Sequence, residues 1–422
     1  MLDPRFIREH PDEVRKGLLR RGLDAGAVDA LLECDKRYRE VLGEVETFRR
    51  QAKEFSRSGG TDSGTREEAR KVRERLKGLE AEERKLREEL DGLLDALPNL
   101  PLPEVPDGRD ESDNVVVREG RKPAKKSFVS QDHLALGEAH GLVDVERAAR
   151  VAGTRFAYLK REGAMLEFAL IRYAFDILSS EGFIPVVPPA MVRPEVFRGM
   201  GRLAADQREE RYHLERDNLY LIGSAEHTLG PMHMDEVLEA AVLPLRYVGF
   251  SPSFRREAGS YGKDTRGIIR VHQFDKAEMF VFASPEASGD ELERLVALQE
   301  RIVSGLKLPY RVVAISAGDM GWTDAKQYDI EVWFPSEERF RETHSASNTT
   351  DFQARGVNVR FRRDAGAKPE YLHMLNATAV AIGRTIAALL ENHQQEDGTI
   401  QIPEALRSYC GFDRIPNPDS KF

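Results

Sequence analysis

The sequence is poor in cysteine and has no long apolar segment, and both shortages limit what the protein can be. Its two cysteines, Cys34 and Cys410, lie far apart along 422 residues and form no cluster with metal-ligating spacing. This usage fits a reducing cytoplasm, and we expect no structural zinc. No apolar run is long enough to span a bilayer, and residues 1–5 lack the basic-then-apolar pattern of a signal peptide. We therefore expect a cytoplasmic protein with no membrane partner.

Positive charge is also in short supply. There are 63 Lys and Arg against 72 Asp and Glu, which leaves a net charge of −9. An acidic chain is poorly suited to coating nucleic acid without specificity, so an RNA partner would need a local basic patch. The length is sufficient for two domains with a sizeable core.

A heptad pattern of apolar residues begins at Leu31 and recurs in two runs, which a segment rich in Gly and Ser at residues 56–65 separates. Two such seams joined by a short polar loop predict an antiparallel helical hairpin over about residues 31–97. The second helix should end at a linker that contains Pro98, Pro101, Pro103 and Pro106. We therefore expect an N-terminal domain at residues 1–106 and a second domain at residues 107–422.

The loop end of this hairpin is basic in an otherwise acidic chain. Residues 49–77 contain ten Lys or Arg and five Asp or Glu. Long arms with basic tips follow phosphate backbones, because neutralised phosphates release their counterions. The periodicity alone fits equally well a coiled-coil arm that binds another protein.

Residues 246–282 hold the most distinctive chemistry of the chain. Apolar residues alternate at both ends, and the middle is rich in Gly and charged residues, which predicts two strands and a long loop. An arginine beside such a loop suits a polyphosphate, because a guanidinium forms two parallel charge-assisted bonds to oxygens. Glu257 and Glu278 add acceptors for amine donors. A solvated hairpin of mixed charge would also produce this pattern.

The sequence of this stretch resembles motif 2 of the class II aminoacyl-tRNA synthetases, in the version found in seryl-tRNA synthetases. Three strings carry the likeness: R-x-E at residues 255–257, A-G-x-x-G-K-D-T-R-G at 258–267 and H-Q-F-x-K-x-E at 272–278. A helix followed by a strand that ends in proline, at residues 163–189, resembles motif 1. Residues 375–394 resemble motif 3, with a strand that we expect to end near Asn376 and a helix after it.

The resemblance implies an α+β fold, in which helices flank the antiparallel sheet of a class II synthetase and an N-terminal antiparallel coiled-coil arm precedes it. It also implies an ATP-dependent ligase that converts L-serine to seryl-adenylate and transfers the seryl group to the 3′ end of tRNA-Ser. The arm would hold the long variable arm of that tRNA. Motif 1 would form a homodimer, and Mg²⁺ would accompany ATP.

The resemblance further assigns catalytic roles to Arg255, at the α-phosphate of ATP, and Arg384, at its γ-phosphate. An arginine in an otherwise apolar helix, such as Arg384, needs an anionic partner if it is buried. Glu257 would accept from the adenine amine while Phe274 stacks on the ring. The remaining expected ATP contacts are Arg256, Val271, Glu342, Thr343, His344 and Ser345. Glu342 and Ser345 would also bind Mg²⁺, since hard oxygen donors together with phosphates hold this ion.

The serine pocket implied by the resemblance is formed by Ser224, Ala225, Glu226, Arg255, Glu278, Asn376 and Thr378. A pocket built to bond a hydroxyl group rejects analogues that lack it. The carboxylate of serine is already ionised, so catalysis would depend on positioning and charge neutralisation rather than on a nucleophilic side chain. The chain departs from the family pattern at Ser224, usually Thr, and at His227, more often apolar.

Two other functions fit parts of the sequence. A degenerate paralogue would bind tRNA or a partner without charging it, although the phosphate- and metal-binding positions all look occupied. A ligase that loads amino acids onto a carrier protein would share the core, but the full heptad arm with its basic tip counts against it.

Overall fold

The computed structural model describes the 422 residues except 59–62, 205–206, 259–265 and 420–422. The chain divides into two compact units, Met1–Leu100 and Pro101–Phe422. This division falls within the proline-rich segment that the sequence marks as a linker. Within the described ranges, no helix combines the length and the apolar character needed to cross a membrane.

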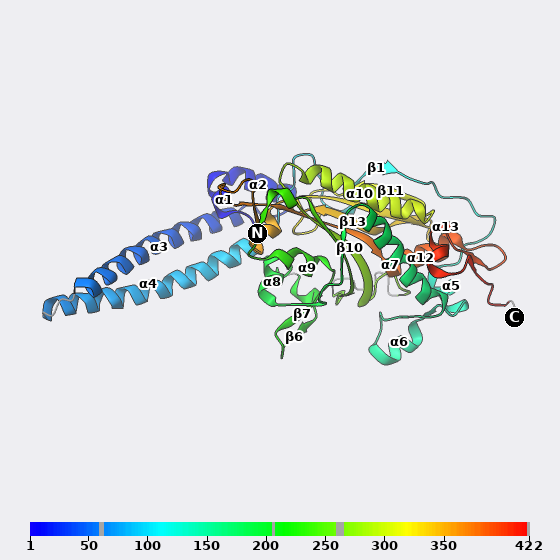
Figure 1. The fold of residues 1–422 in the computed structure, drawn as a ribbon, viewed down its shortest axis with the longest axis horizontal. Helices are drawn as coiled ribbons and strands as arrows, with labels where there is room; N and C mark the ends of the chain where they lie inside the picture. The colour runs from blue at the N-terminus through cyan, green and yellow to red at the C-terminus, as the bar shows by residue number, and fades with distance from the viewer. Residues whose placement is uncertain (59–62, 205–206, 259–265, 420–422) are drawn as a thin grey trace. The chain divides into compact units, whose positions relative to one another are not determined.

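The first unit is helical, with α1 (Pro4–Glu9), α2 (Pro11–Arg20), α3 (Ala27–Ser58) and α4 (Ser63–Asp95). The helices α1 and α2 begin at prolines, whose fixed φ and missing N–H suit the first helical turn. The helices α3 and α4 run side by side as an antiparallel hairpin (Figure 1). Both extend into the segment expected to be a turn, and its centre, residues 59–62, lies outside the described residues.

The seam between α3 and α4 is apolar with one polar interruption. Glu83 occupies the heptad position that has no apolar residue, and the Tyr38 hydroxyl donates to its Oε1 at 3.4 Å. Outside the seam, Arg49 Nη2 lies 2.9 Å from Glu80 Oε1 on the opposite helix. The buried seam residues are Leu31, Cys34, Val45, Leu79, Leu86, Leu90 and Leu94.

The second unit is built on an eight-stranded sheet with the order β1-β11-β12-β13-β16-β10-β9-β4. In that order, the strands are β1 (Val115–Glu119), β11 (Tyr310–Ala314), β12 (Lys326–Phe334), β13 (Arg339–Asn348), β16 (His373–Ala381), β10 (Gln273–Ala283), β9 (Leu245–Phe254) and β4 (Ile184–Val186). Every neighbouring pair is antiparallel except β4 and β9, which are parallel. Most of the loop expected between β9 and β10, residues 259–265, lies outside the described residues.

Three longer helices pack on this sheet: α7 (Glu162–Ser180), α10 (Ser288–Gly305) and α12 (Ile382–His393). Their apolar faces join the sheet in the main core, to which Leu166, Leu170, Leu292, Leu295, Ile386 and Leu389 belong. The strand β16 continues to Ala381, five residues beyond the end expected near Asn376. The strand is buried almost throughout, so its sequence lacks the alternation that marks a half-exposed strand.

The remaining elements are short. The helices are α5 (His133–Ala139), α6 (Val145–Ala152), α8 (Pro194–Gly199), α9 (Glu226–Leu229), α11 (Phe352–Gly356) and α13 (Glu404–Cys410), with 3₁₀ turns at Glu111–Asp113, Arg208–Glu210, Gly230–His233 and Ala240–Val242. The strands are β2 (Val143–Asp144), β3 (Tyr158–Leu159), β5 (Met191–Val192), β6 (His213–Leu214), β7 (Leu219–Leu221), β8 (Val237–Glu239), β14 (Arg360–Arg362), β15 (Glu370–Tyr371), β17 (Ile400–Gln401) and β18 (Arg414–Ile415). They form four small sheets, of which β5-β7-β6 precedes the Ser224 segment.

The centre of the large sheet brings distant segments together, because β13, β16, β10 and β9 are consecutive neighbours. The ladder between β13 and β16 ends where Ala346 faces Ala377, just before Ser345 and Thr378. The buried Gln299 of α10 spans this point, and its Nε2 donates to the carbonyl oxygens of Ser345 and Thr378, each at 2.8 Å. The two strands are therefore held by a side chain where their own pairing stops.

Candidate active site

Two adjoining cavities lie at the centre of the sheet. The first, of about 140 Å³, is lined by Arg255, Glu257, Val271, Phe274, Glu342, Thr343, Ser345, Thr378 and Arg384, among others. The second, of about 400 Å³, is lined among others by Arg202, Arg211, Ser224, Glu226, His227, Glu278 and Asn376. Four residues line both cavities, namely Arg255, Glu257, Lys276 and Ser345.

Arg255 lies at the junction of the two cavities. Its Nη2 donates to the carbonyl oxygen of Gly223 at 3.4 Å, and its Cζ is 5.3 Å from the ring centroid of Phe274. Its Nε is buried and has no hydrogen-bond partner among the described residues. Burial and the nearby Arg384 lower the pKa of Arg255. An anion in the first cavity would reverse that effect, because an opposite charge favours the protonated guanidinium.

Arg384 reaches the same cavity from the first turn of α12. Its Nη1 lies 3.0 Å from Glu342 Oε1 and also donates to the Glu342 carbonyl oxygen at 3.1 Å. The preceding Gly383 lets the start of α12 pack closely on the Ile268 backbone, since a Cβ there would lie 2.8 Å from the carbonyl oxygen of Ile268. Arg384 lowers the pKa of Glu342. The Glu342 side chain is half-exposed, so solvent weakens this interaction.

Glu342 and Ser345 supply a carboxylate and a hydroxyl group to the wall of the first cavity. Both come from β13, and Ser345 faces Asp329 of β12 in the sheet register. The described residues contain no group of three or more His, Cys, Asp and Glu arranged to hold a metal ion. Magnesium commonly uses one or two protein carboxylates with phosphate oxygens and water, so this donor set fits Mg²⁺ bound together with a polyphosphate.

The second cavity is lined by three buried carboxylates, Glu226, Glu278 and Asp324. Glu278 of β10 forms an ion pair with Lys276, two residues earlier on the same strand. Lys276 Nζ also donates to Thr378 Oγ1 at 3.5 Å, which links β10 to β16. Burial raises the pKa of Glu278, and Lys276 opposes that rise.

Glu226, another of these carboxylates, is fixed by two partners from distant segments. Its Oε1 accepts from Arg202 Nη2 at 2.6 Å and from Gln353 Nε2 at 2.8 Å. Burial opposes ionisation of Glu226, but Arg202 and Gln353 outweigh it, and the pKa lies below the ordinary value. Beside it, Ser224 Oγ accepts from the backbone N–H of Glu226 at 3.2 Å. This wall is therefore charged and firmly positioned.

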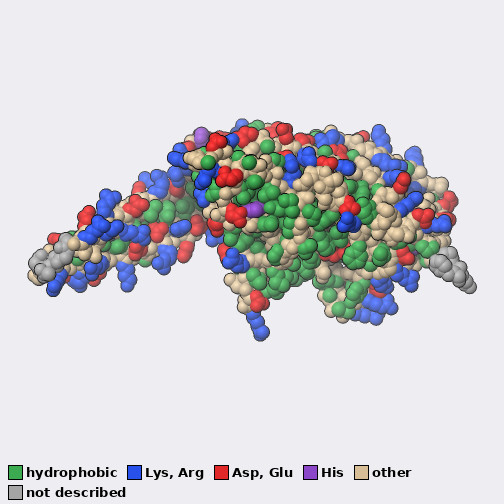
Figure 2. All heavy atoms as spheres, in the orientation of Figure 1, with side chains coloured by type: hydrophobic (Ala, Val, Ile, Leu, Met, Phe, Trp, Pro, Cys, Tyr) green, Lys and Arg blue, Asp and Glu red, His purple; other side chains and the backbone are tan. Residues whose placement is uncertain are grey.

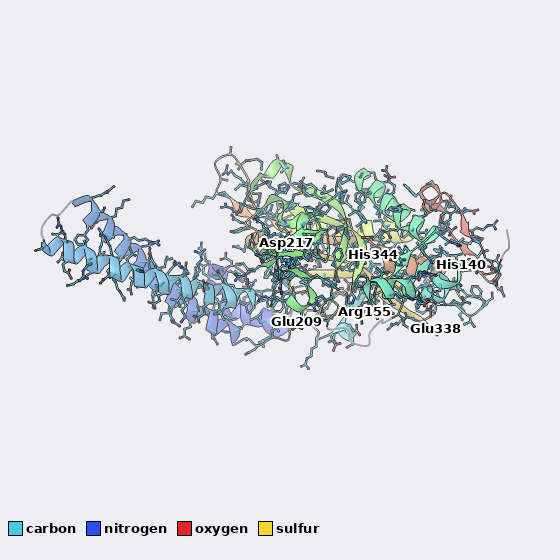
Figure 3. All side chains as sticks on the ribbon, turned by 90° about the horizontal axis from the view of Figure 1, so that it is seen from below. His140, Arg155, Glu209, Asp217, Glu338 and His344 are labelled. Atoms are coloured by element: carbon cyan, nitrogen blue, oxygen red, sulfur yellow. The ribbon has the colours of Figure 1, made fainter. Side chains whose placement is uncertain are left out.

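Three of the residues expected at the site line neither cavity. Arg256 is exposed, with its Cζ 6.0 Å from the ring centroid of Tyr212. His344 is buried among the strands of the sheet, where its Nδ1 lies 2.7 Å from Thr343 Oγ1 (Figure 3). Burial lowers the pKa of His344 to about 4. Ala225 is fully buried in a hydrophobic cluster.

Sequence reasoning missed Lys276, Arg202 and Arg211 as parts of the cavity walls. Lys276 could have been found, because residues two apart on a strand share one face, which places it beside Glu278. Arg202 and Arg211 belong to irregular segments without periodicity, and nothing local in the sequence connects them to Glu226 or Arg255.

Comparison with known proteins connects this geometry to one family. Residues 1–101 match the seryl-tRNA synthetase N-terminal domain, and residues 212–393 match the tRNA synthetase class II core domain (G, H, P, S and T). A serine–tRNA ligase from Acidothermus cellulolyticus is 45% identical over 418 residues, which cover 98% of this chain and 99% of that relative. The chain belongs to the seryl-tRNA synthetase family. Its predicted fold class and family resemblance are therefore confirmed.

Solved structures of this family agree. The seryl-tRNA synthetase from Pyrococcus horikoshii, complexed with ATP, is 42% identical and superposes with a TM-score of 0.91, over 99% of this chain and 100% of that chain. A cytoplasmic serine–tRNA ligase from Naegleria fowleri, in complex with AMP, is 30% identical, with a TM-score of 0.86 and 99% of both chains covered. Both comparisons cover 99% of this seryl-tRNA synthetase family member.

Proposed function

We propose that this chain is an ATP-dependent ligase that activates L-serine as seryl-adenylate and transfers the seryl group to the 3′ end of tRNA-Ser. The observation that carries the proposal is the convergence of Arg255 and Arg384 on one cavity that adjoins a second cavity with three buried carboxylates. The related Pyrococcus structure contains ATP, which supports ATP as the nucleotide.

In the first step, the serine carboxylate oxygen attacks the α-phosphorus of ATP, and the bond to the bridging oxygen of pyrophosphate breaks. Arg255 is proposed to hold the α-phosphate and Arg384 the γ-phosphate. Phe274 stacks on the adenine ring and Glu257 accepts from its amine, while Arg256, Val271, Thr343 and His344 stay predicted ATP contacts. The rate gain comes from fixed positive charge at developing negative charge, without a protein nucleophile.

Glu342 and Ser345 would hold Mg²⁺, which supplies charge neutralisation at the phosphates when bound. The Arg384–Glu342 ion pair supports this proposal, because it brings the guanidinium proposed for the γ-phosphate close to a proposed metal ligand. The chain's own contribution here is to hold the Arg384 guanidinium of α12 against the Glu342 carboxylate of β13.

Serine is proposed to occupy the second cavity near Arg255. The carboxylates of Glu226 and Glu278 accept from its ammonium and hydroxyl groups, and Ser224 and Asn376 line the same cavity. Ala225, which lines neither cavity, and Thr378, which lines the first, stay predicted serine contacts. In the second step, a hydroxyl oxygen of the terminal ribose attacks the seryl carbonyl carbon, and the bond to AMP breaks, with release of AMP and a proton. A pocket whose polar groups require a hydroxyl partner disfavours alanine strongly.

The N-terminal domain, residues 1–106, is proposed to bind tRNA-Ser in the cytoplasm. Its hairpin has ten basic and five acidic residues near the loop end, at residues 49–77. That excess suits the phosphates of a long variable arm, which is recognised by shape and backbone rather than by base edges.

The catalytic domain, residues 107–422, is proposed to form a homodimer through motif 1. The strand β4 is an edge of the large sheet. Apolar side chains are exposed on α7 and at β4, notably Met165 (46%), Phe168 (65%), Ile184 (48%) and Val187 (85%). Figure 2 shows apolar side chains gathered on the face of the unit where α7 lies. An unpaired edge beside an apolar patch favours a two-fold contact.

The test is ATP–pyrophosphate exchange with each amino acid, followed by charging of purified tRNA isoacceptors. We expect exchange with serine and charging of tRNA-Ser alone. Arg255→Ala should lower serine-dependent exchange by about 100- to 1,000-fold, as loss of a charge-stabilising donor does. The exposed Arg216 on the β6–β7 turn provides a control, and Arg216→Ala should leave exchange unchanged.

Each competing function has its own result in this test. No exchange with any amino acid would indicate a paralogue without ligase activity, whereas exchange without tRNA charging would indicate a carrier-protein ligase. Near-normal exchange by Arg255→Ala would remove the role assigned to Arg255.

A further inference from the structure

Arg211 is a largely buried guanidinium on the wall of the second cavity. It directly follows the 3₁₀ turn Arg208–Glu210, in a segment that Glu209 and Asp217 locate in Figure 3. Its Cζ lies 5.4 Å from the ring centroid of the fully buried Phe197, which fixes the orientation of the group. Its Nε is buried without a hydrogen-bond partner, and among the described residues Arg211 forms no ion pair.

The other cations near this cavity have assigned partners. Arg202 pairs with Glu226, and Lys276 pairs with Glu278. Arg255, which is also without an ion pair among the described residues, faces the phosphates of ATP in the proposed function. Arg211 is left as the cation of this wall that lacks both an ion pair among the described residues and a role at the nucleotide, although Glu226 and Glu210 lie near enough to favour its charged form.

Arg211 and Arg255 approach Gly223 from two directions. Arg255 donates to the Gly223 carbonyl oxygen, while a Cβ on Gly223 would lie 2.7 Å from Arg211 Nη1. Burial together with Arg202 and Arg255 lowers the pKa of Arg211 to about 9, and Glu226 and Glu210 offset only part of this effect, so the group stays protonated at neutral pH in an unfavourable field. A buried charge in such surroundings is costly unless a counter-charge is supplied.

The remaining uncompensated charge does not fit serine or ATP. Arg211 is absent from the first cavity, where the triphosphate belongs. The ammonium and hydroxyl groups of serine need acceptors rather than a cation, and its carboxylate reacts beside Arg255. The second cavity, at about 400 Å³, is also larger than so small an amino acid requires, since pockets of ~300–1,000 Å³ hold drug-sized ligands.

The third substrate, the tRNA, has the size to fill the rest of the second cavity and the negative charge to pair with Arg211. The 3′-terminal nucleotide must reach the seryl carbonyl, and it carries a phosphodiester on its 5′ side. We propose that Arg211 binds the phosphodiester that precedes the 3′-terminal nucleotide of the tRNA and so positions the terminal ribose for acyl transfer. The planar guanidinium matches the two free oxygens of a phosphate, and its stacking on Phe197 limits the entropy lost on binding. This inference rests on the proposed function.

Arg211→Met tests the role with the smallest change in shape, because methionine keeps an apolar stem against Phe197 and removes the charge. Loss of one charge-assisted contact should lower kcat/KM for tRNA charging by about 10- to 100-fold. Serine-dependent exchange, which needs no tRNA, should fall by less than about threefold. Loss of a charge-assisted contact to serine or ATP would instead lower exchange by ~10-fold or more. The slope of log KM for tRNA against log salt should decrease by about 0.7, the value for one single-stranded phosphate. Arg216→Met, on the exposed β6–β7 turn, is the matched control and should leave the tRNA kcat/KM and exchange unchanged.

A modified tRNA identifies the phosphate without altering the protein. A neutral methylphosphonate in the last internucleotide linkage should lower charging by the unaltered enzyme as much as Arg211→Met does. The same tRNA should cause no further loss with the Arg211→Met enzyme, because the contact is already absent. Arg211→Lys should recover part of the charging rate, since it restores the charge without the bidentate geometry.

The outcomes separate this inference from the proposed function. If the unaltered enzyme fails to charge tRNA-Ser, the proposed function itself is wrong. If it charges normally and the losses from Arg211→Met and the methylphosphonate are additive, Arg211 does not bind this phosphate. A parallel fall of exchange and charging in Arg211→Met, with the methylphosphonate tRNA charged normally, would instead place Arg211 at the adenylate-forming step and overturn the inference.

Discussion

Replacement of Gln299 by leucine tests what holds the two cavity-bearing strands in place. Gln299 is fully buried, and one amide nitrogen donates to backbone carbonyls of both β13 and β16. Gln299→Leu conserves most of the volume and removes the donor. Each buried carbonyl that loses its partner costs about 1–3 kcal/mol. The lost Oε1 of Gln299, which has no hydrogen-bond partner, offsets part of this cost. The net loss in free energy of unfolding should be about 2–3 kcal/mol.

The kinetics of Gln299→Leu test the role of this residue more specifically than its stability does. Gln299 joins the carbonyls of Ser345 and Thr378, so its loss should let β13 and β16 shift relative to each other at this point. The side chains of Ser345 and Thr378 that line the cavities should shift with them. We expect KM for ATP and for serine to rise together by about tenfold, equivalent to ~1.4 kcal/mol of lost binding each. Urea unfolding at a fixed protein concentration and exchange kinetics measure the two effects.

Leu292→Ala, on the same helix and equally buried, is the matched control. It should destabilise by about 2–5 kcal/mol through a cavity in the core and leave both KM values nearly unchanged. If Gln299→Leu also leaves both KM values unchanged, the bridge between the strands is not what positions Ser345 and Thr378, and the reasoning is refuted.

Two further predictions concern buried charge. Arg202→Met leaves the 6%-exposed Glu226 without its ion partner and should cost about 3–5 kcal/mol of unfolding free energy. Adding Glu226→Gln should recover most of that loss, and equal stabilities of the single and double variants in urea would contradict the pairing. Burial and a hydrogen bond to Asp275 raise the pKa of Glu167 to about 8. The folded chain then keeps a proton that the unfolded chain loses, so this contribution to stability is complete below about pH 4.5 and declines as the pH rises towards about 8. The stability advantage of Glu167→Gln over the unaltered chain should therefore grow by up to about 1 kcal/mol per pH unit between about pH 5 and 8, and a pH-independent difference in thermal unfolding would disprove it.

The parts of the fold that follow local rules could be predicted from the sequence. The heptads of the hairpin and the alternation around motif 2 correspond to α3, α4, β9 and β10. The predicted end of β16 was wrong by five residues, because a strand that is buried on both faces shows no alternation of apolar and polar residues. The apolar run after Asn376 therefore resembled the start of the helix that follows.

The site residues that could be predicted are those that belong to a recognisable sequence motif or share one face of a single strand. Motif strings pointed to Arg255 and Arg384, which line one cavity, and the spacing of Lys276 and Glu278 could have shown their pairing. The Arg202–Glu226–Gln353 contacts join three separate segments, and the chemistry of each residue alone is ordinary. Tertiary packing decides such contacts, and it leaves no periodic trace in the sequence.

In the proposed function, ATP and serine occupy the two cavities, so the four residues that line both make the two binding events interdependent. Arg255 and Lys276 contribute to the potential in each cavity, so a ligand that neutralises or reorients them in one alters the affinity of the other. Thermodynamic reciprocity then requires that serine change the dissociation constant of a non-reactive ATP analogue by the same factor by which the analogue changes that of serine. A shared wall thus makes each substrate an effector of the other before any bond is formed.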